Sequence, residues 1–135
     1  MRNMVKYVLG LCVLFMVGCT SVPGKWRLAQ FQDVSSSYEH AIRWGDYDVA
    51  SSFRKKQETD HEAQHVDKLD KIRVTSYELL SVNLSEDNLR VHQAVKIRYF
   101  SADQMIEKTL VDQQQWEYDD TDKAWFLQSG LPAFR

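Results

Sequence analysis

The sequence of 135 residues carries 17 basic and 19 acidic side chains, and 44% of its residues are hydrophobic. This length provides one domain together with processing segments, and the composition is typical of a globular chain rather than a disordered one. Residues 1–18 hold Arg2 and Lys6 and no acid, so the remainder has a net charge of about −4 by counting. We therefore expect no nucleic-acid partner, because no basic field is left to neutralise phosphates.

The first residues have the order of a secretion signal. Arg2 and Lys6 precede an apolar run of eleven residues, 7–17. A helix of that length spans about 16 Å, whereas the hydrocarbon core of a bilayer is about 30 Å thick. The run is therefore typical of a signal peptide and not of a membrane span. A soluble core helix beginning at Tyr7 is the alternative, and the absence of a polar face in the run disfavours it.

A cysteine follows this run directly after a glycine. Met16-Val17-Gly18-Cys19 resembles the lipobox of bacterial lipoproteins, although Met16 stands where leucine is commoner. The resemblance implies that residues 1–18 are removed, that Cys19 carries diacylglycerol and that several acyl chains anchor the protein in a membrane. Thr20 differs from the aspartate that often retains lipoproteins in the inner membrane. It therefore implies the outer membrane, with the protein facing the periplasm.

Residues 19–25 are then expected to form a short lipidated tether. Cys12 would be removed with the signal and Cys19 would be lipidated, so the mature domain would have no disulfide. A domain covering residues 26–135 would depend on its hydrophobic core alone.

Two helices are predicted first in this domain. Between Trp26 and Trp44, apolar residues recur at helical spacing, and Gly45 predicts the end of that helix. Asp46 can cap a second helix. The expected apolar stripe of the first helix consists of Phe31, Val34, Tyr38, Ala41 and Ile42, and that of the second consists of Val49, Ala50 and Phe53.

From Lys71 the apolar period changes to two, which predicts strands separated by polar turns. The inward residues are expected to be Ile72, Val74, Leu80, Val82 and Leu84 in the first strand, Leu89, Val91, Val95, Ile97 and Tyr99 in the second, and Ile106, Leu110, Trp116 and Tyr118 in the third, with a short fourth strand over 124–128. This order predicts the α+β class, with N-terminal helices packed on a curved antiparallel sheet of about four strands.

The whole domain resembles the NTF2-like (cystatin-like) superfamily. The residues that carry the resemblance are Trp44-Gly45-Asp46-Tyr47-Asp48 between the helices and Trp125-Phe126-Leu127 in the last strand. The resemblance implies helices wrapped over a curved sheet, often around a conical pocket, and a homodimer formed through the sheets as one option. Because such domains include both enzymes and binding modules, the fold does not decide the function.

One segment matches a catalytic motif. His61-Glu62-Ala63-Gln64-His65 resembles the HExxH signature of zinc metalloproteases, in which two histidines one helical turn apart bind Zn²⁺ and the glutamate is the general base. The neighbours are charged, and Lys71 stands where one protease group has a third histidine. A glutamate could instead be the third ligand, but Glu78 and Glu86 lie in or beside the predicted first strand and not on a following helix. We therefore expect an incidental match with solvated side chains and no cofactor, while zinc hydrolysis and regulatory metal binding are the alternatives.

Three other groups of residues are candidate sites. Arg90, His92, Lys96 and Arg98 share one strand face, where pairing with Glu107 favours a solvated, salt-bridged surface. The aromatic residues Trp44, Trp116, Trp125 and Tyr99 are expected in the core rather than around a pocket. Asp33 and His40 lie seven residues apart on the first helix, which favours two surface residues over an acid–base pair.

The leading expectation is a non-enzymatic periplasmic module anchored in the outer membrane. It would bind an envelope protein or a small apolar ligand through its sheet or a pocket. The alternatives are a small zinc hydrolase that uses His61, Glu62 and His65, and an NTF2-like enzyme with a polar group deep in its cone.

Overall fold

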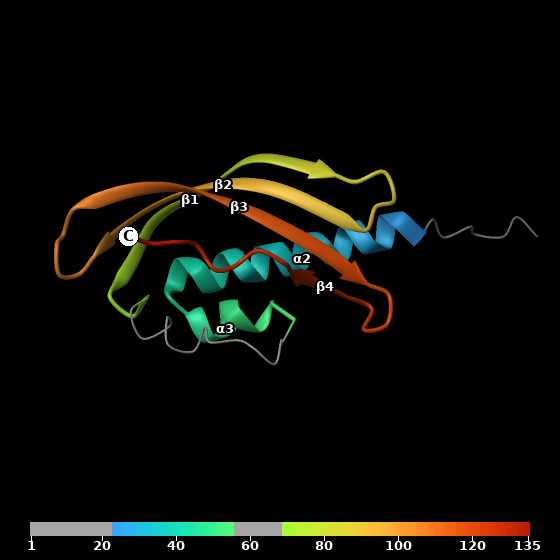
Figure 1. Cartoon of the computed structure of the whole chain (residues 1–135), viewed down its shortest axis with the longest axis horizontal. Coiled ribbons are helices and arrows are strands. Elements are labelled where there is room, and N and C mark those ends of the chain that lie inside the picture. The colour runs from blue at the N-terminus through green and yellow to red at the C-terminus, as the bar shows by residue number, and fades with distance from the viewer. Residues whose placement is uncertain (1–22, 56–68) are drawn as a thin grey trace, which may run out of the picture.

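The computed structural model describes residues 23–55 and 69–135. These form the helices α2 (Pro23–Trp44) and α3 (Tyr47–Ser52) and the strands β1 (Ile72–Leu84), β2 (Arg90–Ser101), β3 (Glu107–Asp119) and β4 (Ala124–Leu127). The strands form one antiparallel sheet in the order β1-β2-β3-β4. The sheet is curved, and the helices lie on one side of it (Figure 1). The predicted α+β class, with helices packed on a four-stranded antiparallel sheet, is confirmed.

Helix α2 begins earlier than predicted and ends where predicted. It starts at Pro23, so the last three residues of the expected tether are helical. Proline suits this position because its φ is already helical and the first turn leaves N–H groups unpaired. At the other end Gly45 has a φ of 75°. The Gly45 N–H donates to the Ile42 carbonyl (3.3 Å) and the Asp46 N–H to the Ala41 carbonyl (2.8 Å), which is a Schellman motif.

Helix α3 differs from its prediction in two respects. Asp46 occupies the N-cap position, but its side chain makes no capping hydrogen bond. Val49 is exposed, whereas Tyr47 and Ala50 are buried. Tyr47 packs against Phe134 with ring centroids 5.9 Å apart. The burial of Tyr47 therefore depends on a distant segment, and the local pattern does not reveal it.

The core lies between α2 and the inner face of the sheet. Phe31 makes edge-to-face contacts with Trp116 (5.8 Å) and Trp125 (5.1 Å), and Tyr38 contacts Trp116 at 5.3 Å. The Trp125 indole N–H donates to the Arg27 carbonyl at 2.9 Å, so the polar group of this buried ring is paired. The predicted stripe of α2 is confirmed, with Phe31, Tyr38, Ala41 and Ile42 buried and Val34 packed against them.

The expectation for the aromatic residues is confirmed for three of the four. Trp116, Trp125 and Tyr99 are buried in the core, and Tyr99 also lines a hollow beside β3. Trp44 is 75% exposed and stands beside His40 at 5.9 Å, so its placement in the core was wrong. It lies on the last turn of α2 beside the exposed Arg43, whereas Ala41 and Ile42 of the same turn are buried.

Strand β1 does not keep one alternation along its length. Its register against β2 shifts between Val74 and Ser76 and again between Leu79 and Ser81. Each extra residue at a bulge reverses the parity of the side chains that follow. Directly paired residues point to the same face, so Tyr77, opposite Ile97, and Leu79, opposite Val95, lie on the inner face. The prediction of Leu80 as an inward residue was wrong for this reason.

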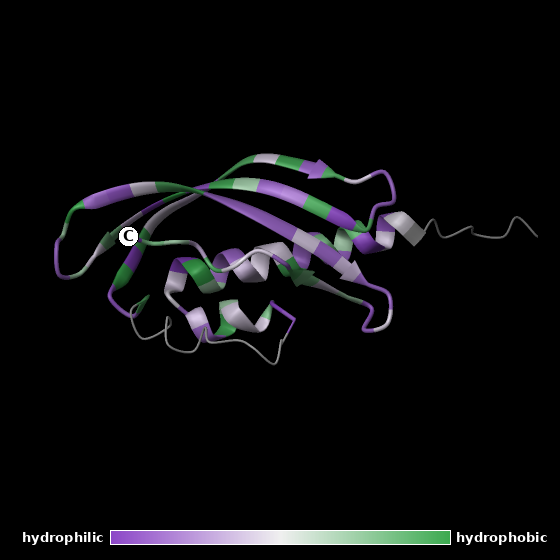
Figure 2. Ribbon diagram, in the orientation of Figure 1, coloured by the Kyte–Doolittle hydropathy of each residue, from purple (hydrophilic) through white to green (hydrophobic). Residues whose placement is uncertain are grey.

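Strands β2 and β3 alternate as predicted, apart from their ends. Ile106 lies before β3 and is exposed, so its inclusion among the inward residues was wrong. On the outer face Arg98 pairs with Glu107 at 3.8 Å, and Lys96 pairs with Glu78. The predicted salt-bridged surface is therefore confirmed. Figure 2 shows the alternation of hydrophilic and hydrophobic residues along these strands.

The two edges of the sheet differ. Beyond β4, the Leu127 N–H donates to the Phe53 carbonyl at 2.8 Å, so the chain after α3 covers that edge. Beyond β1, none of the described residues pairs with the edge. Over residues 23–55 and 69–135, no helix is long and apolar enough to cross a membrane.

Candidate functional site

A groove lies between α2 and the inner face of β1 and β2, and we call it the α2–β1 groove. Its volume is about 370 Å³, within the range of about 300–1,000 Å³ that small-ligand sites occupy. Its lining residues are Leu28, Phe31, Gln32, Ser35, Ser36 and Glu39 of α2 and Leu79, Val82, Leu84, Val91 and Gln93 of the sheet.

The sheet wall of this groove is apolar and uncovered. Leu79, Val82 and Leu84 are 54%, 49% and 40% exposed. Their partners on β2 are Val95, Gln93 and Val91, and all three are buried, so these positions of β1 belong to the inner face. On this face the second half of β1 is therefore less covered than the β2 positions that pair with it. Apolar side chains gathered in this way are typical of a binding surface.

The floor of the groove is a buried amide. The Gln93 Nε2 group donates to Ser35 Oγ at 3.2 Å and to Gln114 Oε1 at 2.6 Å. Both N–H bonds of this amide are therefore used within the protein. An apolar occupant of the groove would leave neither of them unpaired.

The amide of Gln114 continues this chain of hydrogen bonds across the sheet. Its Nε2 group donates to Asp112 Oδ2 at 2.8 Å and to the Tyr77 hydroxyl at 3.0 Å. Burial raises the pKa of the Asp112 carboxyl, and the hydrogen bond from Gln114 opposes part of that shift. The inner face thus contains a largely buried carboxyl group that accepts a hydrogen bond from an amide.

Two tyrosines lie near this carboxyl group. Burial, followed by the negative charge of Asp112, raises the pKa of Tyr38, and burial also raises the pKa of Tyr77. The Tyr38 hydroxyl is buried and has no hydrogen-bond partner within the described ranges. Both phenols therefore stay neutral at physiological pH, and Tyr77 accepts the hydrogen bond from Gln114.

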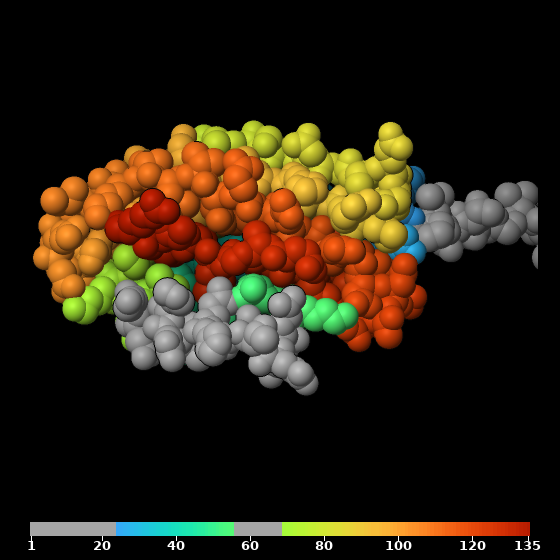
Figure 3. Space-filling view, viewed as in Figure 1, coloured from blue at the N-terminus to red at the C-terminus, as the bar shows by residue number. Residues whose placement is uncertain are grey.

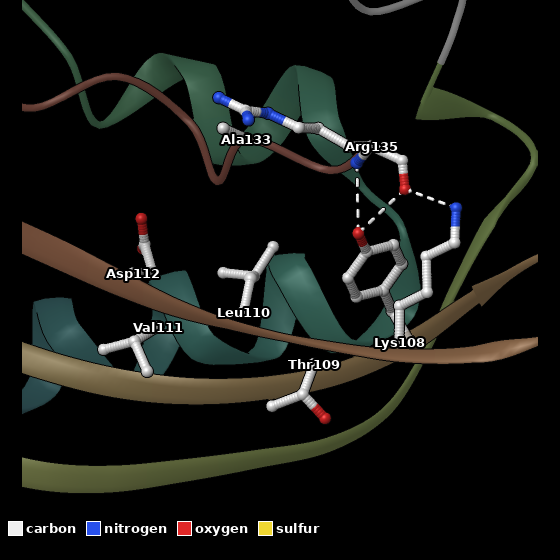
Figure 4. Close-up of a pocket in the computed structure, with 8 residues that line it drawn as sticks. Lys108, Thr109, Leu110, Val111, Asp112, Ala133 and Arg135 are labelled. Atoms are coloured by element: carbon white, nitrogen blue, oxygen red, sulfur yellow. Dashed lines mark hydrogen bonds between the residues drawn. The ribbon is translucent and has the colours of Figure 1, made fainter.

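A second hollow, the β3–tail groove, lies between β3 and the C-terminal residues, with a volume of about 640 Å³. Figure 3 shows the C-terminal segment lying along β3. The Arg135 N–H donates to the Tyr99 hydroxyl, which donates to the Arg135 main-chain oxygen, both at 3.0 Å. Lys108 Nζ donates to the same oxygen at 2.8 Å (Figure 4). Leu110 and Asp112 point into this hollow in Figure 4, so the Asp112 carboxyl borders it.

The sequence-predicted site residues fall into two groups. Cys19, His61, Glu62 and His65 lie outside the described residues. Asp33 and His40 are both exposed on α2, as expected of two surface residues. Within residues 23–55 and 69–135, no group of three or more His, Cys, Asp or Glu side chains is placed to hold a metal ion.

The sequence reasoning missed the buried polar residues. Gln93 has the parity of Val91 and Val95, while Asp112 and Gln114 have the parity of Leu110 and Trp116. A polar residue at an inward position of an alternating strand is the signal that identifies them.

No protein-family model matches the chain, and neither curated proteins nor solved structures include a match to it.

Proposed function

We propose that this chain is a lipid-anchored binding module of the bacterial envelope. In this proposal Cys19 carries the lipid, the outer membrane holds the protein, and an NTF2-like domain faces the periplasm. The α2–β1 groove binds the apolar part of a ligand or of an envelope protein. The observation that carries the binding role is the exposure of Leu79, Val82 and Leu84 on the face of the sheet that is otherwise buried.

Filling the groove would release water from these side chains. Burial of apolar surface contributes about 25 cal/mol per Å², and the β1 wall offers three large aliphatic groups at once. The amide floor costs little, because Gln93 already bonds Ser35 and Gln114. The geometry therefore favours retention of an apolar group over chemical attack on it.

A pair of substitutions tests this function. Val82→Asp places a charge in the groove, whereas Val111→Asp changes a valine that is 51% exposed on the opposite face of the sheet. Binding of an environment-sensitive apolar dye to the full chain is expected to weaken about tenfold or more in the first variant, or about 1.4 kcal/mol. It should be unchanged in the second. Equal binding by both variants would contradict the proposal.

Asp112 supports a second candidate function, a small-molecule enzyme of the NTF2-like type. A buried carboxyl group with a raised pKa that borders an open hollow is a candidate general base. Turnover of a small molecule that Asp112→Asn abolishes, with dye binding in the α2–β1 groove unchanged, would favour this second function.

A further inference from the structure

The start of α2 lies at one end of the α2–β1 groove. A Cβ atom placed on Gly24 would be 3.7 Å from the Asn88 side-chain nitrogen, so this end of α2 lies against the turn between β1 and β2 (Figure 1). Leu28 follows Pro23 by five residues, or about 7.5 Å of helix. Leu84 and Val91 flank the same turn and also line the groove. The groove therefore opens beside the point where the chain enters the domain.

The proposed lipid anchor is close to this opening. Cys19 precedes Pro23 by four residues, and a chain of that length spans at most about 14 Å even when fully extended. Trp26, on the first turn of α2, is 57% exposed. Tryptophan is enriched at membrane–water interfaces, where its ring is half in an apolar layer. An anchored domain would thus hold this end, with the groove opening, next to the membrane.

The lining of the groove suits an uncharged chain. Glu39 is the one ionisable residue among the lining residues of the groove, and it lies about 24 Å along α2 from Pro23. From Leu28 to Glu39 the helix wall extends about 16 Å. An extended apolar chain that enters beside Pro23 would meet Leu28, Leu84 and Val91 before any charge.

A peptide strand fits this groove less well. Strand addition needs a regular row of main-chain groups along the edge of a sheet. The edge beside the groove is β1, whose two register shifts interrupt that row. An acyl chain needs no main-chain partners and requires only apolar walls.

We propose that the α2–β1 groove holds one acyl chain of a phospholipid of the anchoring membrane, and that the chain enters beside the start of α2. This inference rests on the proposed function, both for the anchor and for the groove. In this arrangement the head group stays at the opening near Gly24 and Asn88, and the acyl chain lies along Leu84, Val82 and Leu79.

Photo-crosslinking in membranes tests the identity of the occupant. Val82 is replaced by p-benzoylphenylalanine in the full chain, and Val111 is replaced in a matched control of similar exposure on the outer face. Mass spectrometry of the irradiated protein is expected to show a phospholipid adduct at position 82 about tenfold more abundant than at position 111.

A second substitution separates occupation of the groove from contact with the bilayer surface. Ser36→Trp fills the groove from an exposed position of α2, and Ser37→Trp changes the neighbouring exposed position outside the lining. The first is expected to reduce the position-82 adduct about tenfold, whereas the second leaves it unchanged. Each variant is checked for an unchanged melting curve, and Gln32→Trp replaces Ser36→Trp if the latter unfolds.

Any other outcome of these experiments contradicts the proposal that the groove holds a phospholipid acyl chain. An adduct that survives when the groove is filled would show contact with the bilayer alone. An adduct with a protein, with a second copy of this chain or with the acyl chains on Cys19 would exclude phospholipid but keep the groove as a binding site. Equal adducts at positions 82 and 111 would contradict the proposed function as well.

Discussion

The side-chain amides of Gln93 and Gln114 are joined by a hydrogen bond of 2.6 Å between two directly paired residues of β2 and β3. Gln114 is flanked by Gln113 and Gln115, which are exposed on the other face. A slip of one residue would place one of these neighbours opposite Gln93 and reverse every side chain of β3. The buried amide pair is therefore satisfied in this register and helps to specify it.

Loss of the Gln114 amide should destabilise the fold. Gln114→Ala removes the partner of Gln93, Asp112 and Tyr77 at once, and an unsatisfied buried polar group costs about 1–3 kcal/mol. We expect the free energy of unfolding, measured with urea, to fall by at least about 2 kcal/mol. Gln113→Ala, on the exposed face, should stay within about 0.5 kcal/mol of the wild type. Similar values for the two variants would show that the amide chain contributes nothing to stability.

The Asp112 carboxyl should make stability depend on pH. Burial raises its pKa in the folded protein above the ordinary value, so between the two values the folded state binds more protons than the unfolded state. The free energy of unfolding should therefore decrease as the pH rises through this interval, and the loss is complete above the folded-state pKa. Asp112→Asn keeps an oxygen that can accept from Gln114 and removes the charge.

We expect Asp112→Asn to be more stable than the wild type at neutral pH. Its free energy of unfolding should not show the decrease that the wild type shows as the pH rises through the pKa of Asp112. Urea unfolding of both proteins from acid to neutral pH measures the difference. If the free energies of unfolding of the two proteins changed in parallel with pH, the raised pKa of Asp112 would be contradicted.

Phe31 should contribute more to stability than any exposed aromatic residue of α2. It is 6% exposed and packs against Trp116 and Trp125, so Phe31→Ala should cost roughly 3–5 kcal/mol from lost burial and from the cavity left behind. Trp44→Ala removes a larger but exposed ring from the same helix and should change the free energy of unfolding by less than about 0.5 kcal/mol. Chemical unfolding of the two variants distinguishes these outcomes, and a small loss for Phe31→Ala would place that ring outside the core.

Cys19→Ser should abolish lipid attachment. The sulfur of Cys19 is the acylation point in the proposed lipoprotein, so the variant is expected to incorporate no labelled fatty acid and to keep residues 1–18. Labelling of cells followed by electrophoresis measures both properties. Cys12→Ser, within the segment to be removed, is the matched control and should be labelled like the wild type. Labelling of Cys19→Ser would reject the lipid anchor.

The HExxH match should prove incidental. Catalytic zinc needs a third protein ligand and an open coordination position in a shaped site. We expect the untagged protein to retain almost no zinc after dialysis, and His61→Ala and His65→Ala to fold like the wild type. Elemental analysis measures the metal. Stoichiometric zinc that either substitution removes, together with a hydrolytic activity, would instead establish the zinc hydrolase.

Some features of this protein follow from residues adjacent in the sequence. The apolar stripe from Phe31 to Ile42 and the stop at Gly45 depend on helical periodicity and on the tolerance of glycine for positive φ. The alternation of β2 depends on a period of two. Such signals are local, so the sequence by itself determines the α+β class and the outer salt-bridged face.

Other features depend on segments far apart in the chain, and only the tertiary structure decided them. The bulges in β1 reverse its parity, because the pairing with β2 sets its register. The exposure of Leu79, Val82 and Leu84 depends on the path of α2 over the sheet, which leaves this wall open. The chain from Ser35 through Gln93 and Gln114 to Asp112 joins α2, β2 and β3. The alternation of β2 and β3 marks Gln93, Gln114 and Asp112 as inward residues, but their hydrogen-bond partners are a property of the packed molecule.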